Sequence, residues 1–135
     1  MWPFSISIWI SNPVRIYGNK WYDSYTLGAS SCRNSFKMGG IRIFVNKNLN
    51  FMNIDLRKFS YEQDIEAGAV KLSVNSLNIC ILSVYRAPTG NFAHFFDKLE
   101  MILNLLYSYN TQLIICGAIN VNYLVANNKK SLLLL

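Results

Sequence analysis

Hydrophobic and polar residues alternate along the first part of the chain, with the period of two that is typical of β-strands covered on one face. The pattern predicts strands over residues 4–10, 22–32, 41–45 and 51–56. Pro13, a Gly-Gly pair at 39–40 and a polar stretch at 46–50 separate them, and such residues interrupt regular structure. The N-terminal part of the chain is therefore expected to form a sheet.

Two longer apolar stretches follow, over residues 67–74 and 77–85, with Asn75 and Ser76 between them. Two strands joined by two residues of this kind predict a β-hairpin. The second stretch is almost continuously apolar around residues 79–84, which is typical of a central strand covered on both faces.

A different period begins after Asn91, a residue type that caps helices. Apolar residues then recur at steps of three and four, which predicts an amphipathic helix that frays near residues 109–110. Its expected apolar face comprises Phe92, Phe95, Phe96, Leu99, Ile102, Leu103 and Leu106. A short buried strand is predicted over residues 113–116, so periodicity alone indicates an α+β fold in which a helix covers a sheet.

Composition limits the classes of protein to consider. The 135 residues are 52% hydrophobic and 15% charged, which fits one packed domain, or part of a larger one, rather than a disordered chain. The net charge of +6 is compatible with a nucleic-acid partner, but the longest basic run is Lys129-Lys130. A mildly basic solvated surface explains the charge equally well.

The three cysteines, Cys32, Cys80 and Cys116, are odd in number and widely spaced, which argues against a disulfide framework or a zinc site. The apolar N-terminus is short and lacks a basic region, so it makes a poor signal peptide. No apolar run reaches the roughly 18 residues of a membrane span. We expect an intracellular protein, cytoplasmic or nuclear and not secreted, with no membrane partner.

Three motifs carry a resemblance to a known family. They are a Gly-Gly strand at residues 39–45, a strand over 81–88 that ends in Tyr-Arg-Ala-Pro, and a strand over 112–120 that ends in Gly-Ala-Ile-Asn. In this order, with the helix between the last two, the chain resembles the non-LTR retrotransposon branch of the endonuclease/exonuclease/phosphatase family. The resemblance extends from about Trp9 to Leu124.

The resemblance implies a DNase I-like fold, which is a four-layer α/β sandwich of two facing sheets flanked by helices. It also implies hydrolysis of a phosphodiester with Mg²⁺, a hard cation that prefers oxygen ligands. Residues 1–135 would form an incomplete domain of this type, mainly one mixed sheet with a covering helix. The family's earliest strand would precede Met1, and its closing Ser-Asp-His segment would follow Leu135.

Departures from the family pattern concern the chemistry directly. The family's last motif reads Gly-Asp-Phe-Asn, and Ala118 stands at the position of its Asp, while Asn120 is retained. The family's metal-binding Glu, which is followed by Ser or Thr and then Trp, aligns with Ser7. A methyl and a neutral hydroxyl would stand where two carboxylates are needed. We therefore expect no metal site, no cofactor and no catalysis, although Mg²⁺ serves the intact family.

Tyr85 is the best retained functional position, since the family's Tyr faces the scissile phosphate. With Asn120 it makes up the inherited catalytic positions. Arg86 is the candidate for a contact with a DNA backbone. The alternative is that Tyr85 only ends a strand and that Arg86 is solvated.

Other candidate residues are weaker. His94, the single histidine, lies within the predicted helix and is expected to be a surface or packing residue rather than the family's terminal His. Asp55, Asp64 and Glu66 match no metal-binding loop and are expected to be solvated. The tryptophans Trp2, Trp9 and Trp21 could stack on bases, but aromatic residues in strands more often pack in a core.

Three hypotheses follow for the function. The first is a catalytically inactive relative of a retrotransposon endonuclease, with at most weak binding to DNA. The second is a non-enzymatic nucleic-acid-binding module, whose affinity would fall steeply as salt rises. The third is an active phosphodiesterase whose acids lie elsewhere in the chain. The uncovered sheet face of an incomplete domain also predicts poor solubility.

Overall fold

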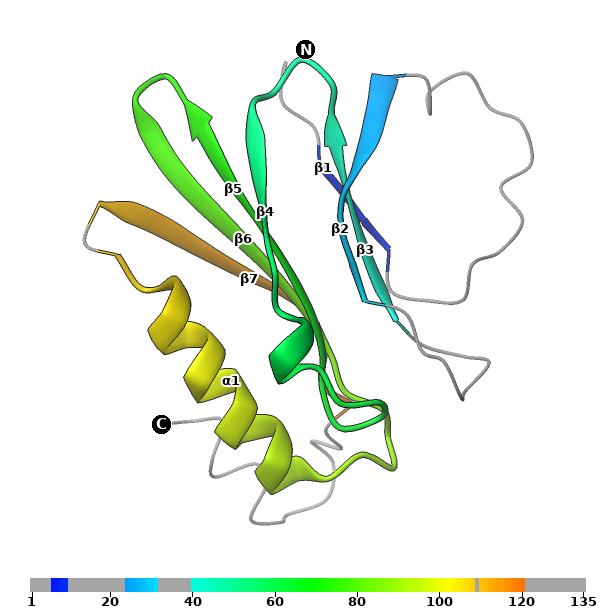
Figure 1. Cartoon of the computed structure of the whole chain (residues 1–135). Coiled ribbons are helices and arrows are strands. Elements are labelled where there is room, and N and C mark those ends of the chain that lie inside the picture. The colour runs from blue at the N-terminus through cyan, green and yellow to red at the C-terminus, as the bar shows by residue number, and fades with distance from the viewer. Residues whose placement is uncertain (1–5, 10–23, 32–39, 109, 121–135) are drawn as a thin grey trace.

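Two β-sheets and one helix form three layers in the computed structural model of the protein (Figure 1). The structure describes residues 6–9, 24–31, 40–108 and 110–120. The predictions for Trp2, Trp21, Cys32 and the C-terminal residues after 120 fall outside these ranges, as does the side chain of Trp9.

The smaller sheet has three antiparallel strands in the order β1-β3-β2. Its strands are β1 (Ile6–Trp9), β2 (Tyr25–Ser31) and β3 (Ile41–Asn46), which lie within the predicted strand ranges or extend them by one residue. On β3, buried and half-buried residues alternate along the whole strand, as the period of two predicts for a strand with one covered face.

The larger sheet has four strands in the order β4-β5-β6-β7. Strand β4 (Phe51–Ile54) pairs with β5 (Glu66–Val74), and β5 forms the predicted hairpin with β6 (Leu77–Tyr85). Asn75 and Ser76 both have positive φ angles, 48° and 67°. Two positive φ angles match the twist of a two-residue hairpin turn, so this prediction is confirmed in detail.

The last strand, β7 (Thr111–Ala118), pairs in parallel with β6, and α1 (Phe92–Leu106) makes the crossover between them. The side chain of Asn91 accepts a hydrogen bond from the main-chain nitrogen of His94 at 3.0 Å, which is the predicted N-cap. Strand β7 is four residues longer than predicted. A short 3-10 helix, Arg57–Phe59, was not predicted, because three residues leave no periodic pattern.

The two sheets pack face to face through one core of buried aliphatic side chains. Ile43 and Val45 of β3 are fully buried there, against Val70 of β5 and Ile81 of β6. Each such side chain contributes about 1.5–3 kcal/mol when it leaves water. This core holds the smaller sheet over one face of the larger one.

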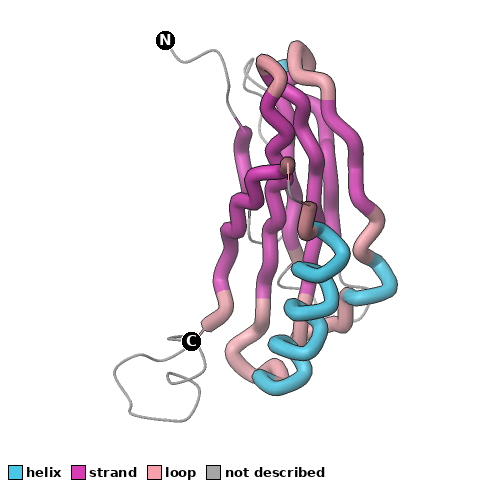
Figure 2. The backbone as a smooth tube through the Cα atoms, turned by 90° about the vertical axis from the view of Figure 1, so that its left-hand side faces the viewer, coloured by secondary structure: helices cyan, strands magenta, loops and turns pink. Residues whose placement is uncertain are grey.

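The second core lies between the larger sheet and α1. Phe95, Ile102 and Leu106 face Ala69 and Leu82 of the sheet, so the predicted apolar face of the helix is confirmed. Strand β6 contributes to both cores and is covered on both faces, as its continuous apolar stretch indicates. Figure 2 shows the helix against one face of the strand layers.

An α+β arrangement with a covering helix is thus confirmed. Within the described ranges, no helix has both the length and the apolar character that a membrane crossing requires.

Candidate functional site

The residues expected to carry chemistry meet where β6 and β7 end. Tyr85 is the last residue of β6 and Ala118 is the last residue of β7, and the two are register partners in the parallel pair. Both are half-buried. The same end of the molecule holds the start of β5, because Glu66 is the partner of Tyr85 on the other side of β6.

Arg86, directly after Tyr85, is 1% exposed. Its guanidinium donates hydrogen bonds to three main-chain carbonyls: Nε to Ile119 at 2.8 Å, Nη1 to Gly90 at 2.6 Å and Nη2 to Asn120 at 2.7 Å. Burial lowers the pKa of this guanidinium, while the negative charge of Asp64 opposes the shift. An arginine fork matches several acceptors at once, so it can fix chain segments relative to one another.

Asn120 completes this arrangement from the other side. Its side-chain amide donates to the carbonyl of Arg86, and the main-chain nitrogen of Arg86 donates to the carbonyl of Ala118 at 2.9 Å. We call these contacts of Arg86 with Gly90, Ile119 and Asn120 the arginine clasp. The clasp ties the segment after β6 to the segment after β7. Asn120 has a φ of 49°, a left-handed conformation that asparagine tolerates better than most residues.

The buried position of Arg86 corrects its expected role. Neither a contact with a DNA backbone nor a solvated side chain fits a guanidinium that is buried and bonded to three carbonyls. The sequence does not indicate this role, because arginine is usually exposed and the acceptors Ile119 and Asn120 lie 33 and 34 positions further along the chain.

Gly117 explains how β7 can approach β6 so closely at this end. Its φ is 142°, and a Cβ atom placed on it would lie 1.7 Å from the carbonyl oxygen of Val84. Only glycine accommodates both the angle and the contact. The Gly-Ala-Ile-Asn motif therefore has a structural basis in addition to the chemistry that its family pattern implies.

The three residues that the family pattern places at the ends of β6 and β7 carry neutral side chains. The side chains of Tyr85, Ala118 and Asn120 are a phenol, a methyl and an amide. None is a carboxylate that could hold a divalent cation or deprotonate water near neutral pH. Ser7 lies on β1 in the other sheet, opposite Phe44 of β3, and its side chain is outside the described part of the structure.

The three acids considered from sequence lie in different settings. Asp55 forms an exposed ion pair with Arg57 at 2.7 Å, and the hydrogen bonds from Arg57 lower the pKa of its carboxyl to about 2. Asp64 pairs with His94, and Glu66 is 2% exposed rather than solvated. Among the described residues, no three His, Cys, Asp or Glu side chains converge on a point where a metal ion could be held.

His94 has a defined structural role. Its Nδ1 lies 2.8 Å from a carboxylate oxygen of Asp64, and its ring packs edge-on against Tyr61 with centroids 4.7 Å apart. The other oxygen of Asp64 accepts a hydrogen bond from the main-chain nitrogen of Asn91 at 2.7 Å. Asp64 therefore joins the loop before β5 to the start of α1, which agrees with the packing role expected for His94.

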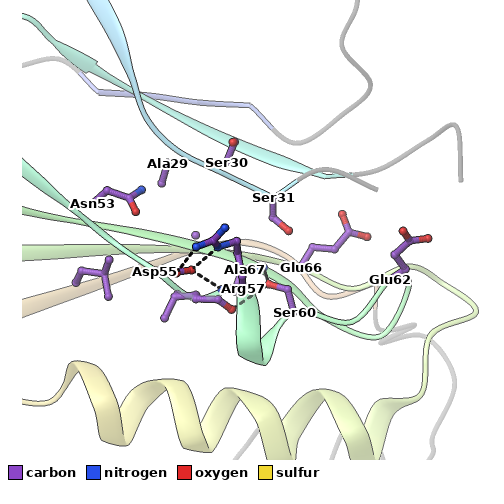
Figure 3. A pocket seen from close by; sticks show the side chains of 13 residues that line it. Ala29, Ser30, Ser31, Asn53, Asp55, Arg57, Ser60, Glu62, Glu66 and Ala67 are labelled. Carbon is purple, nitrogen blue, oxygen red and sulfur yellow. Dashed lines mark hydrogen bonds and ion pairs between the residues drawn. The ribbon is translucent and has the colours of Figure 1, made fainter. Parts of the chain in front are cut away.

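A pocket of about 580 Å³ opens between β2, β4 and the start of β5 (Figure 3). Its lining includes Asn53, Asp55, Arg57, Glu62 and Glu66. The figure shows Arg57 directed to Asp55, with Glu62 and Glu66 at the other end. Asp55 and Glu66 thus share a pocket, but Asp64, Tyr85 and Asn120 do not line it.

Comparison with known proteins adds a structural relative. The fold matches the "Endonuclease domain of TRAS1, a telomere-specific non-LTR retrotransposon", with a TM-score of 0.63 and 12% sequence identity. The match covers 82% of this chain and 50% of that domain, so the chain spans half the length of its relative. No family model and no curated protein matches the sequence. The resemblance inferred from three short motifs is confirmed for the fold.

Proposed function

We propose that this chain is a retrotransposon-endonuclease-like domain that does not cleave DNA. One observation carries the proposal: Ala118 is the register partner of Tyr85 where β6 and β7 end, at the position where the family pattern has Asp. The likeness of fold supports the nuclease-like part of the proposal. The substitution supports the loss of activity.

Hydrolysis of a phosphodiester needs negatively charged side chains for two purposes. Carboxylates hold the divalent cation that stabilises the phosphate, and an ionised group positions the attacking water. Loss of one preorganised electrostatic group typically lowers the rate by about 10²–10³. Here Ala118 supplies neither function, and the amide nitrogen of Asn120 is engaged with the carbonyl of Arg86.

A nicking assay tests the proposal. Supercoiled plasmid DNA with Mg²⁺ would be incubated with the purified chain and with the Tyr85→Ala variant, which reports any contaminating nuclease. We expect both proteins to leave the plasmid supercoiled to the same extent as buffer. Mg²⁺-dependent nicking by the wild type that disappears in Tyr85→Ala would overturn the proposal.

DNA binding without cleavage is less well supported. The net charge of +6 favours it, but the side chain that sequence pointed to, Arg86, is buried. The affinity of the wild type and of Tyr85→Ala for DNA would be measured at increasing salt concentrations. An affinity that falls as salt rises would indicate binding through phosphate contacts, because such contacts release counterions.

A further inference from the structure

Strand β7 forms a long edge of the larger sheet. Within the described residues it pairs with β6 on one side only, and it lies at the outer border of the sheet (Figure 1). Alternate residues of a strand direct their N–H and C=O groups to opposite sides. Every second residue of β7 therefore presents hydrogen-bonding groups to an additional strand.

The side chains of β7 are unusually apolar for an edge strand. None of its eight residues is charged, none is proline and none is fully buried. Ile114 and Ile115, which point to opposite faces of the sheet, are each 49% exposed. Proteins usually protect long edges with charges, proline or bulges, and β7 has no charge and no proline.

The opposite edge of the same sheet differs in both length and protection. Strand β4 has four residues, half the length of β7. The side chain of Asn53 on β4 donates to the carbonyl of Gly28 on β2 at 2.7 Å. This hydrogen bond ties the β4 edge to the smaller sheet.

A groove of about 460 Å³ runs beside β7 on its helix side. Leu103, Leu106 and Tyr107 at the end of α1 line it together with Leu113 and Ile115 of β7. Tyr107 is 77% exposed. An added strand would therefore bring its own apolar side chains next to an apolar recess.

We propose that the β7 edge is an association surface for a second copy of this chain. The two β7 strands would pair antiparallel about a twofold axis and join the two four-stranded sheets into one. A strand edge without charge is complementary to itself under such an axis, since each copy offers the same donors and acceptors. No residue of β7 is charged, so the strand itself contributes no electrostatic repulsion across the seam.

The proposal also predicts how the strength of dimerisation depends on salt concentration. Two molecules of charge +6 repel each other at long range, and salt screens this repulsion without weakening apolar contacts. Dimerisation should therefore strengthen as salt rises, opposite to the salt dependence of DNA binding. The proposal does not depend on whether the chain cleaves DNA.

Sedimentation velocity over a wide range of protein concentration tests the association. We expect a reversible monomer–dimer equilibrium for the wild type. Ile114→Lys and Ile115→Lys each place a charge on one face of the seam, and each should weaken the dimer by roughly tenfold or more. Met52→Lys is the matched control, because Met52 is 60% exposed on the β4 edge and should leave the equilibrium unchanged.

Hydrogen exchange provides a second readout that needs no variant. The alternate β7 amides that point away from β6 should become protected as protein concentration rises, whereas amides of β4 should not change. A wild type that stays monomeric at every concentration would overturn the proposal. So would dimers or open-ended aggregates that persist unchanged in Ile114→Lys and Ile115→Lys.

Discussion

Arg86 shows how one buried side chain can hold the end of a sheet together. Its three hydrogen bonds reach segments that follow β6 and β7, and its guanidinium lies 5.3 Å from the ring of Phe92 at the start of α1. Without the guanidinium, three carbonyls would lose their charged donor, that of Gly90 in a buried place and those of Ile119 and Asn120 in partly buried ones. An unsatisfied buried group costs about 1–3 kcal/mol.

Arg86→Met should therefore lower the free energy of unfolding by about 3 kcal/mol or more, measured by urea denaturation. Arg57→Met is the matched control. The side chain of Arg57 is 89% exposed in its ion pair with Asp55, and exposed pairs contribute less than about 1 kcal/mol. Equal losses in the two variants would contradict the structural role of the arginine clasp.

At this scale the sequence predicted positions better than roles. It placed Tyr85, Ala118 and Asn120 at strand ends, where the structure finds them together. It could not show that Arg86 is buried or that Gly117 is required by a contact with Val84, because both depend on residues more than 30 positions away. It also could not show that Asp64 reaches the start of the helix.

The start of α1 is the element whose stability depends most clearly on pH. Partial burial alone would raise the pKa of the Asp64 carboxyl, but the hydrogen bonds from His94 and from the main-chain nitrogen of Asn91 outweigh it and lower the pKa. The folded protein therefore binds this proton less tightly than the unfolded chain. Its contribution to stability is full above the ordinary carboxyl pKa of about 4 and is lost as the pH falls through the lowered value.

Asp64→Asn should reduce stability near pH 6 by about 1 kcal/mol, since it weakens an N-terminal helix contact and a pair with His94. The gap between wild type and variant should narrow as the pH falls below the ordinary carboxyl pKa of about 4, as followed by urea denaturation. Asp97→Asn, on an exposed part of the same helix, controls for the loss of one carboxylate. A gap that stays constant between pH 6 and pH 3 would show that the ionised carboxylate is not responsible.

The helices and strands that the sequence predicts best are those whose apolar pattern extends over many residues. The helix, the hairpin and the doubly covered β6 follow directly from steps of two, three and four in the sequence. The full length of β7 was missed because its first two residues, Thr111 and Gln112, are polar. Their place in the strand is set by pairing with β6, which no local pattern records.

The stability of the whole molecule depends on the core between its two sheets. Ile43 is fully buried there, and it belongs to the smaller sheet while Val70 and Ile81 belong to the larger one. A single cooperative unfolding transition is expected, because neither sheet covers its apolar face alone. All three tryptophans lie within the first 21 residues, and the only α-helix in the described ranges is α1, so two spectroscopic signals can report on opposite parts of the chain.

Ile43→Ala should lower stability by about 2–5 kcal/mol through the loss of buried methylene groups. Tryptophan fluorescence and circular dichroism at 222 nm should then shift together along a urea gradient. Leu77→Ala, at a 52% exposed position beside the hairpin turn, should have a small effect on both signals. A helix signal that survives beyond the tryptophan transition would mean that the layers unfold separately.

The guanidinium of Arg86 binds main-chain oxygens only, so its three hydrogen bonds do not depend on which side chain stands at position 119. Mutations can therefore accumulate in this segment without removing the acceptors on which the local shape depends. The local backbone can in this way keep its shape when the side chain at position 119 changes. A buried arginine directly after the second hairpin strand would therefore mark this architecture in a sequence that lacks the Gly-Asp-Phe-Asn pattern.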